Sequence, residues 1–218
     1  MAEGLVVKAV RGLWYVETED AVLCCSGRGK LRSLGLTPLV GDRVKVTDLG
    51  KGKGSLDEVL PRKNDFVRPA VANLDVLVIL ASAAIPVTEP FLIDRMIAIA
   101  ELKGCDSILC FHKCDLARAP ELVAAYRAAG YPCFETSAVT GEGIPELLEA
   151  LGDRFCAFTG NTGVGKSSLL NALEPKLMLA TGEVSEKLGR GRHTTRHVEL
   201  FRLGRNAIIA DRSEERRV

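Results

Sequence analysis

The fold of this chain is decided by one stretch, Gly160-Asn161-Thr162-Gly163-Val164-Gly165-Lys166-Ser167-Ser168. It follows an apolar run at 155–158 that is typical of a buried strand, and it opens a segment whose leucines share one helical face. The spacing Gly-x-x-x-x-Gly-Lys-Ser between a strand and a helix is that of a phosphate-binding P-loop. Glycines let backbone N–H groups turn inward around a phosphate, Lys166 supplies positive charge for catalysis, and the Ser167 hydroxyl can hold Mg²⁺. The stretch therefore predicts a nucleoside triphosphate site.

A second motif precedes the P-loop and indicates which base is bound. An apolar strand at 107–111 ends in His112-Lys113-Cys114-Asp115. Guanine-specific GTPases carry Asn-Lys-x-Asp at such a strand end, where the Asp carboxylate accepts from the ring N–H and the exocyclic amine of guanine and the Lys stem lies over the base. Asp115 and Lys113 are in place, whereas His112 stands where Asn is expected. His112 can donate one hydrogen bond to guanine N7 but lacks the amide's second link, so we expect weakened affinity.

A third motif, Thr136-Ser137-Ala138, follows a strand-like run at 131–134. It resembles the second guanine loop of GTPases, whose backbone N–H meets the base oxygen. Neither base motif is specific alone, because Lys-x-Asp after a strand is commonly a helix start capped by Asp. Together with the P-loop they favour guanine. Because of His112, an ATP-using P-loop enzyme remains an alternative.

The order of these motifs is the reverse of that in ordinary GTPases, which place the P-loop first. Here the base motifs at 112–115 and 136–138 precede 160–168. Circular permutation produces such an order, and it is tolerated where the original termini lie close together. With the amino-terminal region described below, the chain resembles the RsgA/YjeQ-type ribosome small subunit-dependent GTPases from residue 4 to Asp211.

Composition excludes several other classes. Lys plus Arg number 29 against 28 Asp plus Glu, so no global basic field indicates nucleic acid. No apolar stretch reaches membrane-spanning length and residues 1–20 lack a signal-peptide core, so we expect no membrane partner. Seven scattered cysteines without a Cys-x-x-Cys pair indicate a reducing compartment. We therefore expect a cytoplasmic globular monomer.

Residues 1–68 predict a small all-β barrel, because five short β-favouring runs alternate with turn residues. The segment 25–30 resembles the family's Cys-x-x-Arg-Gly-Lys stretch, whose domain is an OB-fold. Basic residues gather at 28–32 and on the glycine-rich segment 50–54, which we expect to be a mobile loop. These residues either contact RNA by phosphate neutralisation and shape recognition or form a solvated basic turn. The resemblance favours ribosomal RNA.

Residues 69–211 predict a circularly permuted GTPase domain, a three-layer α/β sandwich. The apolar strand 76–80 begins an alternation with helices at 90–102, 121–129 and 144–151, and further strands follow near 197–203 and 206–210. Six strands with intervening helices place the ligand at the carboxyl ends of the parallel strands.

The segment 187–197 is where catalysis would be switched. In GTPases a loop Thr binds Mg²⁺ and senses the γ-phosphate, and Thr194 or Thr195 is the candidate. The resemblance implies that His193 positions the attacking water, since the family lacks the usual catalytic glutamine; a surface imidazole is the other interpretation. Asp211 can hold Mg²⁺ through water.

The last residues depart from the resemblance. The family places Asp-x-Pro-Gly where this chain has Asp211-Arg212-Ser213-Glu214, so the Gly whose N–H meets the γ-phosphate is absent. The family also implies a carboxyl-terminal zinc domain with Cys/His ligands, which this sequence does not show. We expect a shortened or frame-shifted copy whose residues 212–218 form a disordered, aberrant tail.

The resemblance implies a GTPase that converts GTP to GDP and phosphate with Mg²⁺. It also implies a role in maturation of the small ribosomal subunit through rRNA contact, with turnover accelerated by the ribosome. The missing Gly predicts slow or absent turnover in this chain. The alternative is a nucleotide-independent rRNA-binding module whose GTPase half has decayed.

Overall fold

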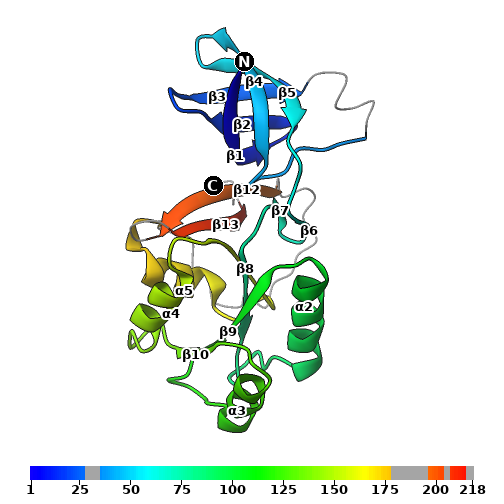
Figure 1. The fold of residues 1–218 in the computed structure, drawn as a ribbon. Coiled ribbons are helices and arrows are strands. Elements are labelled where there is room, and N and C mark those ends of the chain that lie inside the picture. The colour runs from blue at the N-terminus through cyan, green and yellow to red at the C-terminus, as the bar shows by residue number, and fades with distance from the viewer. Residues whose placement is uncertain (28–34, 178–195, 204–206, 215–218) are drawn as a thin grey trace, which may run out of the picture. The chain divides into compact units, whose positions relative to one another are not determined.

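The computed structural model describes residues 1–27, 35–177, 196–203 and 207–214, which fall into two compact units (Figure 1). The first unit comprises Met1–Leu74 with Gly191–Leu200 and Ala210–Val218. The second comprises Asp75–Arg190 with Phe201–Ile209. No helix in the described ranges is long and apolar enough to cross a membrane.

The first unit is a closed five-stranded barrel, as predicted. Its strands are β1 (Ala2–Val10), β2 (Leu13–Glu17), β3 (Val22–Gly27), β4 (Arg43–Gly50) and β5 (Lys53–Val59). β1 pairs antiparallel with both β2 and β4, and the parallel pair β3–β5 closes the barrel. Inward-facing residues alternate along the strands and form its core: Val6, Val16, Leu23, Cys25, Val44, Val46 and Leu56.

The glycine-rich segment at 50–54, which we expected to be a mobile loop, is a tight turn between two paired strands. Gly50 pairs with Lys53 across the β4–β5 hairpin, so only Lys51 and Gly52 connect the strands. Both have positive φ, 55° and 71°, which is the conformation that two-residue hairpin turns require. The glycines serve the turn geometry, and the two lysines lie at a fixed strand end.

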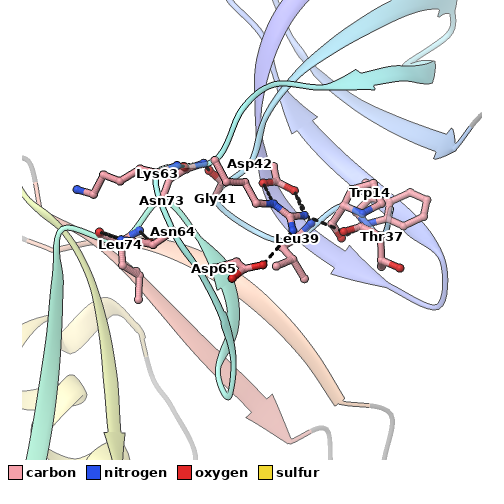
Figure 2. Close-up of polar contacts among 12 residues, drawn as sticks. Trp14, Thr37, Leu39, Gly41, Asp42, Lys63, Asn64, Asp65, Asn73 and Leu74 are labelled. Atoms are coloured by element: carbon pink, nitrogen blue, oxygen red, sulfur yellow. Dashed lines mark hydrogen bonds and ion pairs between the residues drawn. The ribbon is translucent and has the colours of Figure 1, made fainter. Parts of the chain in front are cut away.

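The chain leaving the barrel is clamped back onto it by polar contacts (Figure 2). Asp42 is completely buried and accepts from Nε and Nη2 of Arg62, both at 2.8 Å, and from the Leu39 N–H at 2.7 Å. The Asn73 amide accepts from the Lys63 N–H at 2.8 Å and donates to the Gly41 carbonyl at 2.9 Å. These bonds hold the hairpin of β6 (Asp65–Val67) and β7 (Ala70–Ala72) in the first unit.

Because of this clamp the first unit extends to Leu74, six residues beyond the boundary expected from the sequence at residue 68. The Asn64 amide pairs with both backbone groups of Leu74, each at 2.9 Å. On the other side, the Asp75 N–H donates to the Phe155 carbonyl at 2.8 Å, and its carboxylate accepts from the Phe155 N–H at 2.8 Å. Leu74 is thus bonded into the first unit, and the next residue, Asp75, is bonded into the second.

The second unit is a three-layer α/β sandwich built on the strand order β10-β9-β8-β11, next to which the sheet continues with β13 and β12, two strands that are each divided between the two units. Its strands are β8 (Val76–Ala81), β9 (Asp106–His112), β10 (Cys133–Thr136) and β11 (Phe155–Gly160), which are mutually parallel, with β12 (Arg196–Leu203) and β13 (Ala207–Glu214). All six residues of β8 are buried, as expected for a central strand covered on both faces.

Helices cover both faces of this sheet (Figure 1). On one face α2 (Pro90–Leu102) and α3 (Pro120–Ala128) cover β8, β9 and β10, and the rings of Tyr126 and Phe111 lie 6.4 Å apart. On the other face α4 (Ile144–Leu151) and α5 (Lys166–Leu173), followed by the short η1 (Pro175–Leu177), close the main core. The helices α4 and α5 contribute five fully or nearly fully buried leucines to this core: Leu147, Leu151, Leu169, Leu170 and Leu173.

The last strand is longer than the sequence suggested. β13 runs to Glu214, so residues 212–214 belong to a strand and not to a disordered tail. In the sheet order β13 has neighbours on both sides, β11 and β12, and backbone pairing of this kind orders a segment that has no apolar pattern. Residues 215–218 lie outside the described residues.

Candidate nucleotide-binding site

The P-loop lies where the sequence placed it, between β11 and α5. Gly163 and Gly165 have φ of +81° and +100°, in the left-handed region that favours glycine. Val164 between them is 1 % exposed and anchors the loop in the core. Lys166 and Ser167 occupy the first turn of α5, where the helix leaves unpaired N–H groups and a partial positive charge. The loop therefore has the backbone shape and the charge of a phosphate site.

The P-loop packs tightly against the ends of neighbouring strands. A Cβ on Gly160 would lie 2.8 Å from the Leu80 carbonyl oxygen at the end of β8. A Cβ on Gly165 would lie 2.5 Å from Cδ2 of His112 at the end of β9. Both glycines are thus required by close approach of other parts of the protein, in addition to any need of a phosphate.

The first base loop is tied directly to the P-loop. Lys113 has a left-handed backbone, with φ of 62°, and its ammonium donates to the Gly163 carbonyl at 2.8 Å and the Ile85 carbonyl at 3.1 Å. Asp115 lies two residues further on, with its carboxylate exposed. Motifs fifty residues apart in the sequence are therefore joined by one side chain.

The second base loop is held by its own serine. The Ser137 hydroxyl is buried and accepts from the N–H groups of Val139 and Thr140, both at 3.2 Å, while the Ser137 N–H donates to the Glu142 carbonyl at 3.0 Å. Within the described structure the Ala138 N–H has no such acceptor. Of the two residues that the sequence singled out, Ala138 is therefore the better candidate donor to a base oxygen, and Ser137 shapes the loop.

The two base loops are also joined to each other. The Cys114 N–H donates to the Thr136 carbonyl at 3.1 Å. Arg118 binds both oxygens of Glu142, at 2.6 and 2.9 Å, and its hydrogen bonds hold the pKa of the Glu142 carboxyl below its usual value. Gly143 ends this loop with φ of 70°, and a Cβ there would overlap the Glu135 carbonyl.

His112 is buried behind these loops. Its Nδ1 lies 2.9 Å from the hydroxyl oxygen of Thr136, which in turn lies 3.1 Å from Sγ of Cys110. Burial, and next the charge of Lys113, lower the pKa of His112 to about 4. The ring is therefore neutral at physiological pH, and its Nε2 side faces Gly165 of the P-loop.

The candidates for switching and metal binding are placed only in part. His193, Thr194 and Thr195 lie outside the described residues. From the sequence we expected Asp211 to follow the strand. In the structure it lies within β13. Ser167 is half-buried in the first turn of α5. Among the described side chains, no three His, Cys, Asp or Glu residues are grouped so that they could hold a metal ion.

Sequence reasoning missed the groups that support the loops. The motif that contains Thr136 gives no sign of its bond to His112, and Arg118, Glu142 and Gly143 belong to no recognisable motif, because each acts through a partner distant in the chain. A signal was present for Gly143 alone: the Gly-x-Gly at 141–143 follows a serine that starts a turn.

The arrangement defines a class of protein. The P-loop strand β11 comes after the two strands that carry the base loops, yet it lies parallel beside β8 in the middle of the sheet, which is the topology of a circularly permuted P-loop GTPase. Two family models match the chain, the RsgA N-terminal domain over residues 3–56 and the RsgA GTPase over residues 59–213. The chain belongs to the RsgA GTPase family.

Individual relatives agree with this assignment. The small ribosomal subunit biogenesis GTPase RsgA of Caldanaerobacter subterraneus subsp. tengcongensis is 43 % identical over 212 residues, covering 96 % of this chain and 72 % of that protein. The same-named protein of Geobacillus thermodenitrificans is 44 % identical over 97 % of this chain and 74 % of its own length. Among solved structures, YjeQ from Thermotoga maritima matches with a TM-score of 0.77 at 33 % identity, covering 96 % of this chain and 73 % of that one. The circularly permuted GTPase YloQ matches with a TM-score of 0.69 at 32 % identity, covering 98 % and 71 %.

Proposed function

We propose that this chain binds and hydrolyses GTP in the maturation of the small ribosomal subunit, in contact with ribosomal RNA in the cytoplasm. The observation that carries the nucleotide part is the bond of 2.8 Å from Lys113 to the Gly163 carbonyl, which joins the base loop to the P-loop. The relatives' printed names support the ribosomal part.

Guanine selectivity rests on three groups. The Asp115 carboxylate accepts from the ring N–H and the amine of guanine, a pair of donors that adenine does not offer. The Ala138 N–H donates to the base oxygen, and the Lys113 stem lies along the base. The P-loop residues 160–168 hold the phosphates, with Lys166 on the outer ones.

The donor chemistry fits Mg²⁺, because the Ser167 hydroxyl is a hard oxygen ligand beside the phosphate loop and Thr194, Thr195 and Asp211 would add further oxygens. When bound, the ion neutralises charge on the β- and γ-phosphates. His193 orients the attacking water. The barrel contributes Lys51, in the β4–β5 turn, and Lys53, the first residue of β5, to an RNA phosphate surface.

Fluorescence titration with mant-GDP, mant-GTP and mant-ATP, repeated on Asp115→Ala, tests nucleotide selectivity. We expect guanine-selective binding in the native chain and its loss in the variant. Equal binding of mant-ATP would refute guanine recognition.

Phosphate release with and without small ribosomal subunits tests the second half of the proposal. Stimulation by subunits that Lys166→Ala abolishes is expected. Undiminished subunit binding by Lys166→Ala, with no nucleotide effect, would instead favour an RNA-binding module that does not use the nucleotide.

A further inference from the structure

A cavity lies at the start of β9, at the opposite end of that strand from the first base loop. Its volume is about 500 Å³. It is lined by the last turn of α2, the first residues of β9 and the segment before β10, and Arg154 closes one side. Ser107 in its wall and His112 at the far end of β9 are separated by five residues, roughly 16 Å of strand. The cavity is therefore distinct from the candidate nucleotide site.

The Ser107 hydroxyl is a buried polar group of this cavity wall. The residue is only 7 % exposed. Within the described ranges of the chain, its Oγ is the one buried side-chain oxygen or nitrogen that has no hydrogen-bond partner. Such a group costs free energy when it is left unsatisfied, so native proteins pair it with protein, water or a ligand. Because Ser107 lines the cavity, its missing partner belongs there.

The backbone of Ser107 is open towards the same cavity. Successive residues of a strand in a parallel sheet direct their N–H and C=O groups alternately to the two neighbouring strands. The Asp106 N–H donates towards β8, to the Asp75 carbonyl at 3.0 Å. The Leu109 N–H donates towards β10, to the Pro132 carbonyl at 2.9 Å. Ser107 therefore faces the β10 side, where Pro132 has no N–H for its carbonyl and the described bonds include none from its own N–H.

Ser107 thus offers a ligand three neighbouring groups: an N–H donor, a C=O acceptor and a hydroxyl that can do either. A carboxamide carries a C=O and an N–H side by side, which complements this edge in the way that one strand complements another. The open edge is short, because β10 pairs with β9 from Cys133 and Leu109 onwards. It therefore suits a small amide and leaves no length for an added strand.

The charge around this edge favours a cation. Glu101 lies in the last turn of α2, where the helix carries a partial negative charge and has no basic residue. The structure gives the Glu101 carboxylate one partner, the Tyr131 hydroxyl at 3.4 Å. Of the described residues that line the cavity, Arg154 alone is basic. Its guanidinium is already engaged, with two carbonyls of the last turn of α4 and with Asp106 at 3.5 Å.

We propose that this cavity binds a small amide that also carries a protonated amine. Ser107 pairs with the carboxamide through its N–H, its C=O and its hydroxyl, and Glu101 accepts from the ammonium group. This chemistry occurs in a free amino-acid amide and in the amino terminus of a peptide. No residue assigned to the nucleotide takes part, so the proposal does not depend on the proposed function.

Ser107→Ala first tests the premise that the hydroxyl serves a ligand. The substitution removes Oγ and keeps the backbone edge. Since the hydroxyl has no partner in the protein, urea unfolding followed by circular dichroism should show stability that is unchanged or slightly higher. A clear loss of stability would mean that the hydroxyl supports the fold, and it would overturn the proposal.

NMR titration of the ¹⁵N-labelled chain with glycinamide tests binding, at about pH 6.5, where the amine is protonated. We expect saturable shifts of the Ser107 and Gly130 amide signals, with a Kd in the low millimolar range that so small a ligand allows. Ser107→Ala should weaken binding roughly fivefold, the effect of one neutral hydrogen bond. Glu101→Gln should weaken it roughly threefold, the effect of an exposed ion pair.

Glu146→Gln, at an exposed position of α4, is the matched control for Glu101→Gln and should bind glycinamide normally. Acetamide lacks the amine, so it should bind more weakly than glycinamide to the native chain and equally to Glu101→Gln and the native chain. Tighter binding of glycylglycinamide would identify a peptide amino terminus as the ligand, and equal or weaker binding a free small amide. Absence of saturable shifts with glycinamide, or affinity that Ser107→Ala leaves unchanged, would overturn the proposal.

Discussion

In the first unit the most deeply buried polar side chain that the structure describes is Asp42, and in the second the corresponding side chains are Thr136 and Ser137. Asp42 is satisfied entirely within its unit, by the Arg62 guanidinium and the Leu39 N–H. The Thr136 hydroxyl belongs to a series of bonds that leads through His112 towards the P-loop.

The difference between the surroundings of Asp42 and Thr136 shows how a buried polar group that stabilises the fold differs from one that supports a ligand site. A buried charge that is paired on every side fixes the fold, whereas a buried polar series that ends against the P-loop supports the loops of the candidate nucleotide site. Changes at Asp42 should therefore affect stability alone, and changes around His112 should affect binding. Trp14 is the chain's single tryptophan and lies in β2, so its fluorescence monitors the barrel, while mant-nucleotides monitor the second unit.

Arg62→Ala should give the largest effect, on stability. It leaves the buried Asp42 carboxylate without its ionic partner, which costs about 3–5 kcal/mol. Denaturant unfolding followed by Trp14 fluorescence measures the loss. The volume-matched double variant Arg62→Met/Asp42→Leu should recover much of it. A loss of stability below about 1 kcal/mol in Arg62→Ala would contradict this prediction, because it would mean that the pair contributes no more than an ordinary surface ion pair.

Lys166→Ala should weaken GDP binding roughly 100-fold, the effect of losing a charge-assisted bond to phosphate. Trp14-detected unfolding should be unchanged. Lys176→Ala, an exposed lysine in η1, is the matched control and should bind GDP normally. Equal affinity of both variants would show that the loop does not hold phosphate.

Acid should destabilise the second unit through His112. Its pKa is lowered to about 4 in the folded chain, so between pH 6.5 and 4 the unfolded chain binds the extra proton and stability falls as the pH falls. The loss attributable to this residue is about 2 kcal/mol at pH 5 relative to pH 7.5. Unfolding monitored by hydrogen exchange in β9 measures it, and His112→Asn should flatten that part of the profile. An identical acid profile in the variant would contradict a buried neutral ring.

Arg118→Ala should give the smallest effect. Arg118 and Glu142 join the two base loops but are half-exposed, so we expect about a two- to threefold loss of GDP affinity that disappears at high salt. Titration at two salt concentrations checks this. A loss that persists in salt would mean that Arg118 acts other than through this ion pair.

The parts of the fold that could be predicted from sequence are those coded by local spacing. The P-loop, α2 and the strand ends carrying Lys113 and Asp115 follow from motifs a few residues long, and they lie where expected. The unit boundary at Leu74 could not be predicted, because Asn64 and Asn73 make their bonds 10 and 32 residues away. Likewise the His112–Thr136 bond spans 24 residues, so the sequence marked His112 as unusual but did not show that Thr136 holds its ring.

The central claim is that the two base loops and the P-loop form one guanine site. Titration of Asp115→Asn with mant-GDP and mant-xanthosine diphosphate tests it most directly, because xanthine carries an oxygen where guanine carries the amine. An asparagine amide can donate to that oxygen, whereas the aspartate carboxylate repels it. We expect the variant to lose roughly 30-fold or more in GDP affinity and to gain xanthosine diphosphate binding. Unchanged GDP binding, with no gain for xanthosine diphosphate, would contradict the account.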